Sequence, residues 1–209
     1  SKDRKHWREV IRGAVGSQDL SSQSRKSLSS LVGVKSNLNI QTRTLIEGQP
    51  APGVPIDYRI DTKLGEGGMG AVYLANQTSL NRNVALKVIK PISAKESKRL
   101  QQSRRLETVQ QHRQGQFLSE AVVTGDLEHP NIVPIYDVAA TQDGTVFYSM
   151  KCVSGTPWSK VIRKQSVDDN IGILLKVCDA MAFAHSRGVV HRDLKPENVM
   201  LGEFGVVLV

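Results

Sequence analysis

Three glycines close together in the chain have the spacing of a loop that holds phosphate groups. They lie in the run Gly65-Glu-Gly67-Gly-Met-Gly70-Ala-Val72, which has the pattern G-x-G-x-x-G-x-V. Glycine lets the backbone approach a phosphate and adopt φ values that a Cβ would forbid. Dinucleotide-binding oxidoreductases use the same three glycines, but there the glycines open a helix. Here they lead into strand-like residues 72–75. The sequence therefore predicts a hairpin that covers a bound nucleotide.

A lysine follows inside an apolar strand, Val84-Ala-Leu-Lys-Val-Ile89. Burying a charged amine costs several kcal/mol unless the amine meets anionic partners. Phosphates and one carboxylate would supply such partners. An outward-facing lysine on a strand edge is the alternative, and the glycine hairpin just before the strand makes the phosphate role of Lys87 the preferred interpretation.

The third group is His191-Arg192-Asp193-Leu194-Lys195-Pro196-Glu197-Asn198. An Asp that accepts a hydroxyl proton, a Lys for the transferring phosphate and an Asn for a metal ion together make a phosphotransfer loop. With the glycine hairpin and the Val-Ala-Leu-Lys strand upstream in the required order, residues 56–209 resemble the eukaryotic-type (Hanks-type) Ser/Thr protein kinases. The Gly-Glu-Gly-Gly-Met-Gly hairpin and the run His129-Pro-Asn-Ile-Val133 resemble the bacterial branch most.

This resemblance implies an α+β, protein-kinase-like fold. Its N-lobe would be a five-stranded antiparallel sheet with one packed helix, and its C-lobe would be mostly helical and incomplete. The implied organisation is a basic, Ser-rich linker over 1–55, an N-lobe over 56–153 with a basic helical insert at about 92–114, and the start of a C-lobe over 154–209. The C-lobe part would contain a helix at 167–187 and the catalytic loop at 191–198.

The resemblance also implies a role for each matching residue, with ATP and Mg²⁺ as cofactors and a protein Ser or Thr hydroxyl as substrate. Asp193 would be the catalytic base, Lys195 would contact the transferring phosphate, and Asn198 would bind Mg²⁺. Lys87 would hold the α- and β-phosphates with Glu120 as its helix partner. The residues that would surround the nucleotide are Leu64, Gly65, Gly67, Gly70, Val72, Ala85, the gatekeeper Met150, the hinge Lys151 and Val153, and Met200.

Charge and cysteine content exclude other classes of protein. The formal net charge of +8 is concentrated in residues 1–50 and 90–116, outside the motifs. Trp7 is the only aromatic residue among these charges, so we expect no clear nucleic-acid site. No apolar run reaches the ~20 residues that a membrane-spanning helix needs. The two cysteines form no metal-binding spacing, which favours a reducing, cytoplasmic location.

The helical pattern can be read more closely in two places. Residues 92–114 lack Gly and Pro, and we expect Gly115 to separate this helix from a second helical piece at 116–127. Ser166 and Asp169 should cap the helix at 167–187. One apolar face of this helix consists of Ile171, Leu174, Leu175, Cys178, Met181, Ala182 and His185, and we expect this face to lack much of its usual cover in these 209 residues.

The kinase pattern continues beyond this chain. Kinases place their metal-binding Asp about 13 residues after the Asn, which falls beyond Val209. We therefore expect little or no phosphotransfer by these 209 residues alone. A pseudokinase or regulatory nucleotide- or partner-binding module is the main alternative, although Lys87, Asp193 and Asn198 argue against it. Kinases of small molecules usually carry His-Gly-Asp instead of His191-Arg192-Asp193, which disfavours that class.

Overall fold

The computed structural model describes residues 39–48 and 55–209. They form two compact units, which we describe one at a time. The first unit holds the described residues up to Val122 together with Tyr136–Met150, and the second holds Val123–Ile135 and Lys151–Val209. Most of the predicted linker, residues 1–38 and 49–54, lies outside the described residues.

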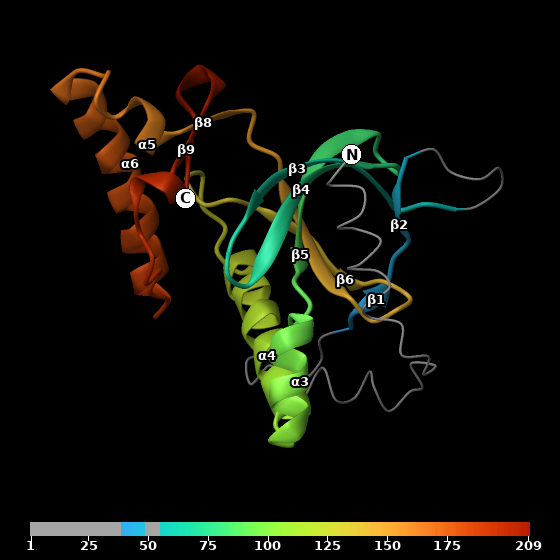
Figure 1. The fold of residues 1–209 in the computed structure, drawn as a ribbon. Helices are drawn as coiled ribbons and strands as arrows, with labels where there is room; N and C mark the ends of the chain where they lie inside the picture. The colour runs from blue at the N-terminus through green and yellow to red at the C-terminus, as the bar shows by residue number, and fades with distance from the viewer. Residues whose placement is uncertain (1–38, 49–54) are drawn as a thin grey trace. The chain divides into compact units, whose positions relative to one another are not determined.

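The first unit is built on one seven-stranded sheet, with strand order β1-β6-β7-β5-β4-β3-β2 (Figure 1). The five predicted strands are β3 to β7, and β1 and β2 extend the sheet at its two edges. The strands are β1 (Gln41–Thr42), β2 (Leu45–Glu47), β3 (Tyr58–Glu66), β4 (Gly70–Gln77), β5 (Arg82–Ile89), β6 (Ile135–Ala140) and β7 (Val146–Lys151).

Side chains that alternate along β4 and β5 divide the sheet into two faces. One face carries the apolar core, to which each of the strands β3 to β7 contributes and against which Leu45 packs. Its members are Tyr58, Ile60, Ala71, Tyr73, Ala75, Val84, Leu86, Val88, Ala139 and Phe147. Successive side chains of a strand point to opposite faces, so Ala85 and Lys87 lie on the other face.

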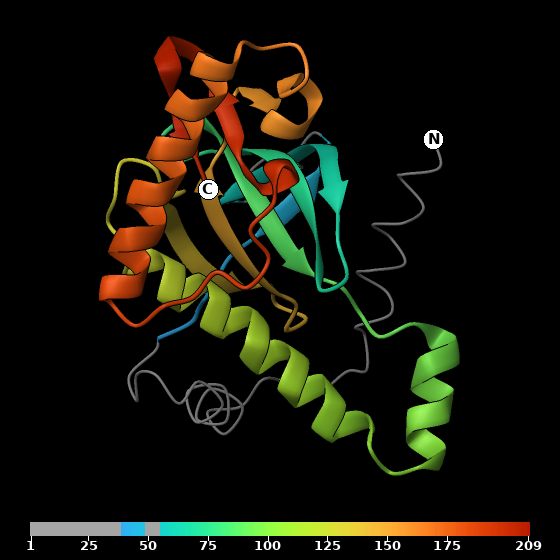
Figure 2. The same cartoon turned by 90° about the vertical axis from the view of Figure 1, so that its left-hand side faces the viewer.

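Two helices follow β5 in the first unit. They are α3 (Ala94–Gln102) and α4 (Leu106–Gly125), joined by a tight turn (Figure 2). The predicted helix break at Gly115 is wrong, because α4 runs straight through it. The break lies at Arg104 instead, whose φ of 55° is left-handed and cannot continue a helix. One glycine costs a helix only about 1 kcal/mol relative to alanine, and the packing of Phe117 and Leu118, both fully buried, offsets that cost.

The residues 41–47, which we call the strap, bridge the two edges of the sheet. β1 pairs in parallel with β6, and β2 pairs in parallel with β3. Residues of the strap are therefore part of the folded unit, which differs from the linker predicted over 1–55. Short strands with mostly polar neighbours carry no periodicity from which the sequence could have revealed them.

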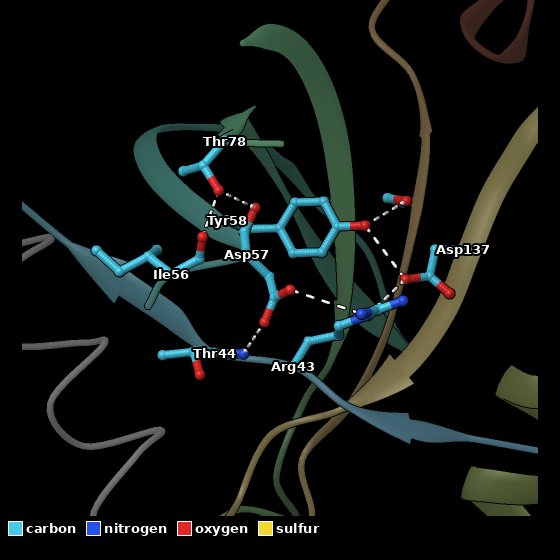
Figure 3. A network of polar contacts seen from close by, with 8 residues as sticks. Arg43, Thr44, Ile56, Asp57, Tyr58, Thr78 and Asp137 are labelled. Carbon is cyan, nitrogen blue, oxygen red and sulfur yellow. Dashed lines mark hydrogen bonds and ion pairs between the residues drawn. The ribbon is translucent and has the colours of Figure 1, made fainter. Parts of the chain in front are cut away.

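Polar contacts hold the strap in place (Figure 3). The Arg43 guanidinium donates to Asp137 Oδ2 at 3.1 Å and lies 3.6 Å from Asp57 Oδ1. The Thr44 N–H donates to Asp57 Oδ2 at 2.8 Å. Tyr58 donates its hydroxyl to Asp137 Oδ2 at 3.3 Å, and burial raises the pKa of this tyrosine. Arg43 thus links two carboxylates: that of Asp57, just before β3, and that of Asp137, in β6.

The second unit contains one long helix, a small sheet and the predicted catalytic loop. Its three-stranded sheet has the order β10-β9-β8. Trp158 anchors the unit, because its backbone N–H donates to Val199 O at 2.8 Å and its indole N–H donates to Asn170 Oδ1 at 2.7 Å. The elements are β8 (Gly155–Pro157), α5 (Trp158–Val161), α6 (Val167–Ser186), the 3₁₀ turns η1 (Pro196–Asn198) and η2 (Glu203–Gly205), β9 (Met200–Gly202) and β10 (Val207–Leu208).

Helix α6 begins as predicted, leaves the predicted apolar face largely uncovered and buries a second stripe. Ser166 caps it by accepting from the Asp169 N–H at 3.1 Å. The predicted apolar face is largely uncovered, as expected, since Ile171, Leu174 and Leu175 are 49%, 48% and 60% exposed. The buried residues are Ile173, Val177, Ala180 and Ala184. Apolar residues surround most of this helix, so periodicity alone fits two stripes, and the stripe with the small Ala180 and Ala184 packs with Leu127 and Ile132.

The C-terminal residues are tied into the second unit. The Val209 N–H donates to Asn131 O at 2.9 Å, and the Val133 N–H donates to Val209 O at 3.1 Å. Among the helices that the structure describes, none has both the length and the apolar character needed to cross a membrane.

Candidate active site

The glycine hairpin joins β3 to β4, and its three glycines are not equivalent. The Gly67 N–H donates to Gly70 O at 2.9 Å and closes the turn. A Cβ on Gly70 would lie 2.7 Å from Val88 O, closer than real Cβ atoms come to any atom. A Cβ on Gly65 would meet nothing within 4 Å, and one on Gly67 would only reach Gly70 O at 4.0 Å. The fold itself therefore requires glycine at position 70, whereas Gly65 and Gly67 leave open space above the loop.

Charged side chains surround the same hairpin. Lys90, directly after β5, donates its Nζ to Gly67 O at 2.7 Å and forms an ion pair with Glu66. Glu66 also pairs with Lys63. Hydrogen bonds from Lys63 and then Lys90 lower the pKa of Glu66 to about 2, so this carboxylate is ionised at neutral pH. The sequence analysis did not identify these three side chains.

Lys87 and Glu120 meet, as predicted, across the face of the sheet that carries Ala85. The Lys87 Nζ lies 2.5 Å from Glu120 Oε1, although the two residues are 33 positions apart. Strand pairing places Lys87 opposite Val72 of β4. The Lys87 side chain is 21% exposed, so its charge sits at the border of the core with a single carboxylate partner among the described residues.

Tyr148 of β7 also contacts this Lys–Glu pair, and the sequence analysis missed it. It donates its hydroxyl to Glu120 Oε1 at 2.7 Å, and the Lys87 Nζ lies 5.7 Å from its ring centroid. Burial, then the neighbouring Glu120 charge, raises the pKa of Tyr148 far above its usual range. A tyrosine in the apolar run Val146-Phe-Tyr-Ser-Met150 was an available signal, because a buried hydroxyl needs a hydrogen-bond partner.

The phosphotransfer loop of the second unit is held by contacts within a few residues. The Asn198 side-chain amide donates to Asp193 O at 2.8 Å and to Asp193 Oδ2 at 3.1 Å. The Lys195 Nζ lies 2.9 Å from the same Oδ2. Hydrogen bonds from Lys195 and then Asn198 lower the pKa of Asp193. The exposed carboxylate of Asp193 is thus contacted by both Lys195 and Asn198, so the three residues predicted for this loop lie together.

The backbone before Asp193 is strained. Arg192 has a φ of 66°, in the left-handed region that non-glycine residues rarely adopt. The Asp193 N–H donates to His191 Nδ1 at 3.3 Å. Strained residues of this kind persist where the surrounding contacts over-determine them, which is common at active sites.

The residues predicted to surround the base of the nucleotide are distributed over both units. Leu64, Val72, Ala85 and Met150 belong to the first unit, whereas Lys151, Val153 and Met200 belong to the second. Leu64 is 54% exposed at the end of β3, and Ala85 is buried in β5. The convergence of these side chains around one base stays a prediction.

Asn198 is the predicted magnesium ligand. Its carboxamide nitrogen is the donor to Asp193, which leaves its carboxamide oxygen for a cation, and Asp193 adds a carboxylate next to it. Oxygen donors of this kind suit Mg²⁺, which usually takes one or two protein ligands together with substrate phosphates. In the part of the chain that the structure describes, no group of three His, Cys, Asp or Glu residues forms a self-sufficient metal site.

Comparison with known proteins identifies the family of the chain. Residues 58–208 match the family described as the protein kinase domain. The chain therefore belongs to the protein kinase family, and its similarity to bacterial Ser/Thr kinases places it in that branch.

Two bacterial relatives show the extent of the match. The chain is 36% identical over 175 residues to Serine/threonine-protein kinase PknD of Protochlamydia amoebophila (strain UWE25). It is 34% identical over 166 residues to the PknD of Chlamydia trachomatis serovar D. These matches cover 75% and 73% of this chain but only 16% of each relative, so the chain spans a small part of their length.

The chain also resembles a solved structure, that of a mutant of the Mycobacterium tuberculosis PknI kinase domain. The TM-score is 0.55 at 27% sequence identity, and the match covers 78% of this chain and 62% of that one. The protein-kinase-like α+β fold predicted from the sequence is thereby confirmed.

Proposed function

We propose that the chain binds Mg-ATP and is the nucleotide-binding part of a kinase that phosphorylates protein Ser and Thr hydroxyls. The observation that carries this proposal is the contact between Lys87 and Glu120, with Tyr148 behind it. Glu120 of α4 accepts hydrogen bonds from Lys87 of β5 and from Tyr148 of β7. These contacts hold the Lys87 amine near the glycine hairpin. In protein kinases such a Lys–Glu pair must be in place for phosphotransfer.

In the proposed reaction, this chain's residues orient the phosphates and move one proton. Lys87 holds the α- and β-phosphates. The substrate hydroxyl oxygen attacks the γ-phosphorus, the bond from that phosphorus to the β–γ bridging oxygen breaks, and ADP leaves. The hydroxyl proton passes to Asp193, whose lowered pKa keeps its carboxylate ionised and ready to accept a hydrogen bond from the hydroxyl.

Lys195 and Asn198 would complete the phosphotransfer loop. Lys195, which lies 2.9 Å from Asp193, is placed to exchange that contact for a γ-phosphate oxygen. Asn198 would hold a Mg²⁺ ion, which when bound neutralises charge on the β- and γ-phosphates.

Nucleotide titration separates the proposed roles of Lys87 and Asp193. A fluorescent ATP analogue should bind saturably to the 209-residue chain in the presence of Mg²⁺. Lys87→Met should weaken this binding about tenfold or more, because it removes a charge-assisted contact to phosphate. Asp193→Asn should leave binding within about twofold, because the proposed base acts on the hydroxyl and not on the nucleotide. Absence of saturable binding by the parent chain would contradict the proposal.

A binding module with little transfer activity is the second candidate for the isolated chain. It is favoured by one observation: among the described residues, no group of three or more His, Cys, Asp or Glu side chains could hold a metal ion by itself. We expect radiolabelled phosphate transfer by the 209 residues to be near background while nucleotide binding persists. Robust turnover would reject this candidate and leave the active kinase.

A further inference from the structure

Lys90, which lies outside the predicted site, contacts the glycine hairpin at three places. The Lys90 backbone N–H donates to Met69 O at 3.1 Å. Its Nζ donates to Gly67 O at 2.7 Å. The same Nζ forms an ion pair with the Glu66 carboxylate. Lys90 directly follows Ile89, the last residue of β5, so these contacts tie the hairpin to the strand that carries Lys87.

Glu66 is held from both sides. Lys63 of the same strand pairs with one of its oxygens and Lys90 with the other. Hydrogen bonds from Lys63 and then Lys90 lower the pKa of Glu66 to about 2, so the carboxylate is ionised at neutral pH. We call these three residues, Lys63, Glu66 and Lys90, the loop clamp.

Apart from the Gly67–Gly70 hydrogen bond that closes the turn, the clamp acts on a segment with few side chains to order it. Gly67 and Gly68 have no side chain, and Cβ atoms built on them would meet almost nothing within 4 Å. Glycine-rich backbone loses more conformational freedom on ordering than any other sequence. A loop that is already ordered before its ligand arrives binds more tightly, since less freedom is lost in the binding step.

We propose that Lys90 is a positioning residue of the nucleotide site, which holds the glycine hairpin in its binding conformation before ATP arrives. This inference rests on the proposed function, because it assigns Lys90 a role in binding the same nucleotide. Its Nζ is occupied by Gly67 O and Glu66, so Lys90 acts through the loop and not as a direct phosphate ligand.

Substitution of Glu66 distinguishes a positioning role of Lys90 from a direct phosphate contact, because the two roles predict opposite changes in ATP affinity. If Lys90 contacted phosphate directly, Glu66→Gln would remove a competing negative charge and tighten ATP binding. If the clamp positions the loop, Glu66→Gln loosens the loop and weakens ATP binding. The two models therefore predict opposite changes for the same substitution.

The experiment uses the 209-residue chain with Lys90→Met, Glu66→Gln and Lys90→Arg, and Lys95→Met as the matched control. Lys95 is exposed on α3 and has no contact to the hairpin among the described residues. Hydrogen exchange of amides 65–71 is measured without nucleotide, and a fluorescent ATP analogue is titrated separately. Lys90→Met and Glu66→Gln should each accelerate exchange and weaken binding roughly fivefold, as expected for the loss of one hydrogen bond. Lys90→Arg and Lys95→Met should stay within about twofold of the parent.

Exchange in β5 and β7 serves as the folding control, because these strands must stay protected in every variant. Tighter binding by Glu66→Gln, or unchanged hairpin exchange in both clamp variants, would overturn the proposal. The exchange experiment needs no nucleotide, so it still decides whether the clamp orders the loop if the parent chain fails to bind ATP. That failure would count against the proposed function instead.

Discussion

The two halves of the candidate site are held together in different ways. In the first unit, the contacts join residues far apart in the chain: Lys87 and Glu120 are 33 positions apart, and Tyr148 and Glu120 are 28 apart. In the second unit, Asn198 holds Asp193 across five positions. The first half therefore depends on how α4 packs on the sheet, whereas the second depends mainly on local backbone geometry.

This difference predicts that core substitutions will damage the two halves unequally. Phe117 is fully buried on α4, one turn from Glu120, and its ring centroid lies 5.2 Å from that of Tyr148. Phe117→Ala should lower the free energy of unfolding by about 3–5 kcal/mol, because it leaves a cavity under the helix. Urea denaturation measures this loss, and nucleotide binding should fall with it.

Leu194→Ala, in the phosphotransfer loop, is the comparison variant. Leu194 is 47% exposed, so its truncation should change the free energy of unfolding by no more than about 0.5 kcal/mol. Equal losses for the two variants would show that the halves do not differ in the way described.

The glycines of the hairpin sharpen the comparison within the first unit. Gly70→Ala should destabilise the protein by about 1–3 kcal/mol, because the new Cβ would lie 2.7 Å from Val88 O and force β4 and β5 apart. Gly67→Ala should leave stability within about 0.5 kcal/mol, since its Cβ meets open space. Thermal melting of both variants checks this, and a larger loss for Gly67→Ala would contradict the assignment of Gly70 as the structural glycine.

Much of this arrangement could be predicted from the sequence. Gly65, Lys87 and Asp193 belong to motifs whose order and spacing identify the family, and the pairing of Lys87 with Glu120 followed from the same resemblance. The strands β3 to β7 followed from alternating side chains and turn residues. These features are encoded within short windows of the chain, which is why sequence patterns reveal them.

Other features depend on contacts that no short window contains. The strap is held by Arg43, which bridges Asp57 and Asp137, and Tyr148 takes part only because it reaches Glu120 across the sheet. The break expected at Gly115 was wrong because tertiary packing carries α4 through this residue. The stripe that α6 buries was likewise decided by its neighbours in the fold. Periodicity ranks the possible faces of a helix, but only its neighbours determine which one is buried.

The smallest expected effect lies in the second unit and concerns pH. The pKa of Asp193 is lowered from its ordinary value of 3.8 mainly by Lys195, so the interaction is complete above that pH and is lost as the pH falls through the folded-state pKa. Lys195→Met should raise the pKa of Asp193 back toward 3.8. Carboxyl-carbon NMR titration of Asp193 measures this, and an unchanged pKa would remove Lys195 as the cause.

The central proposal is that the glycine hairpin and Lys87 of the first unit bind a nucleotide triphosphate. Titration with Mn-ATP, whose paramagnetic ion broadens nearby NMR signals, tests it directly. We expect the amide signal of Gly67 to broaden saturably in the parent chain, and to need about tenfold more nucleotide in Lys87→Met. No broadening in the parent chain, or broadening at the same concentrations in both proteins, would contradict the proposal.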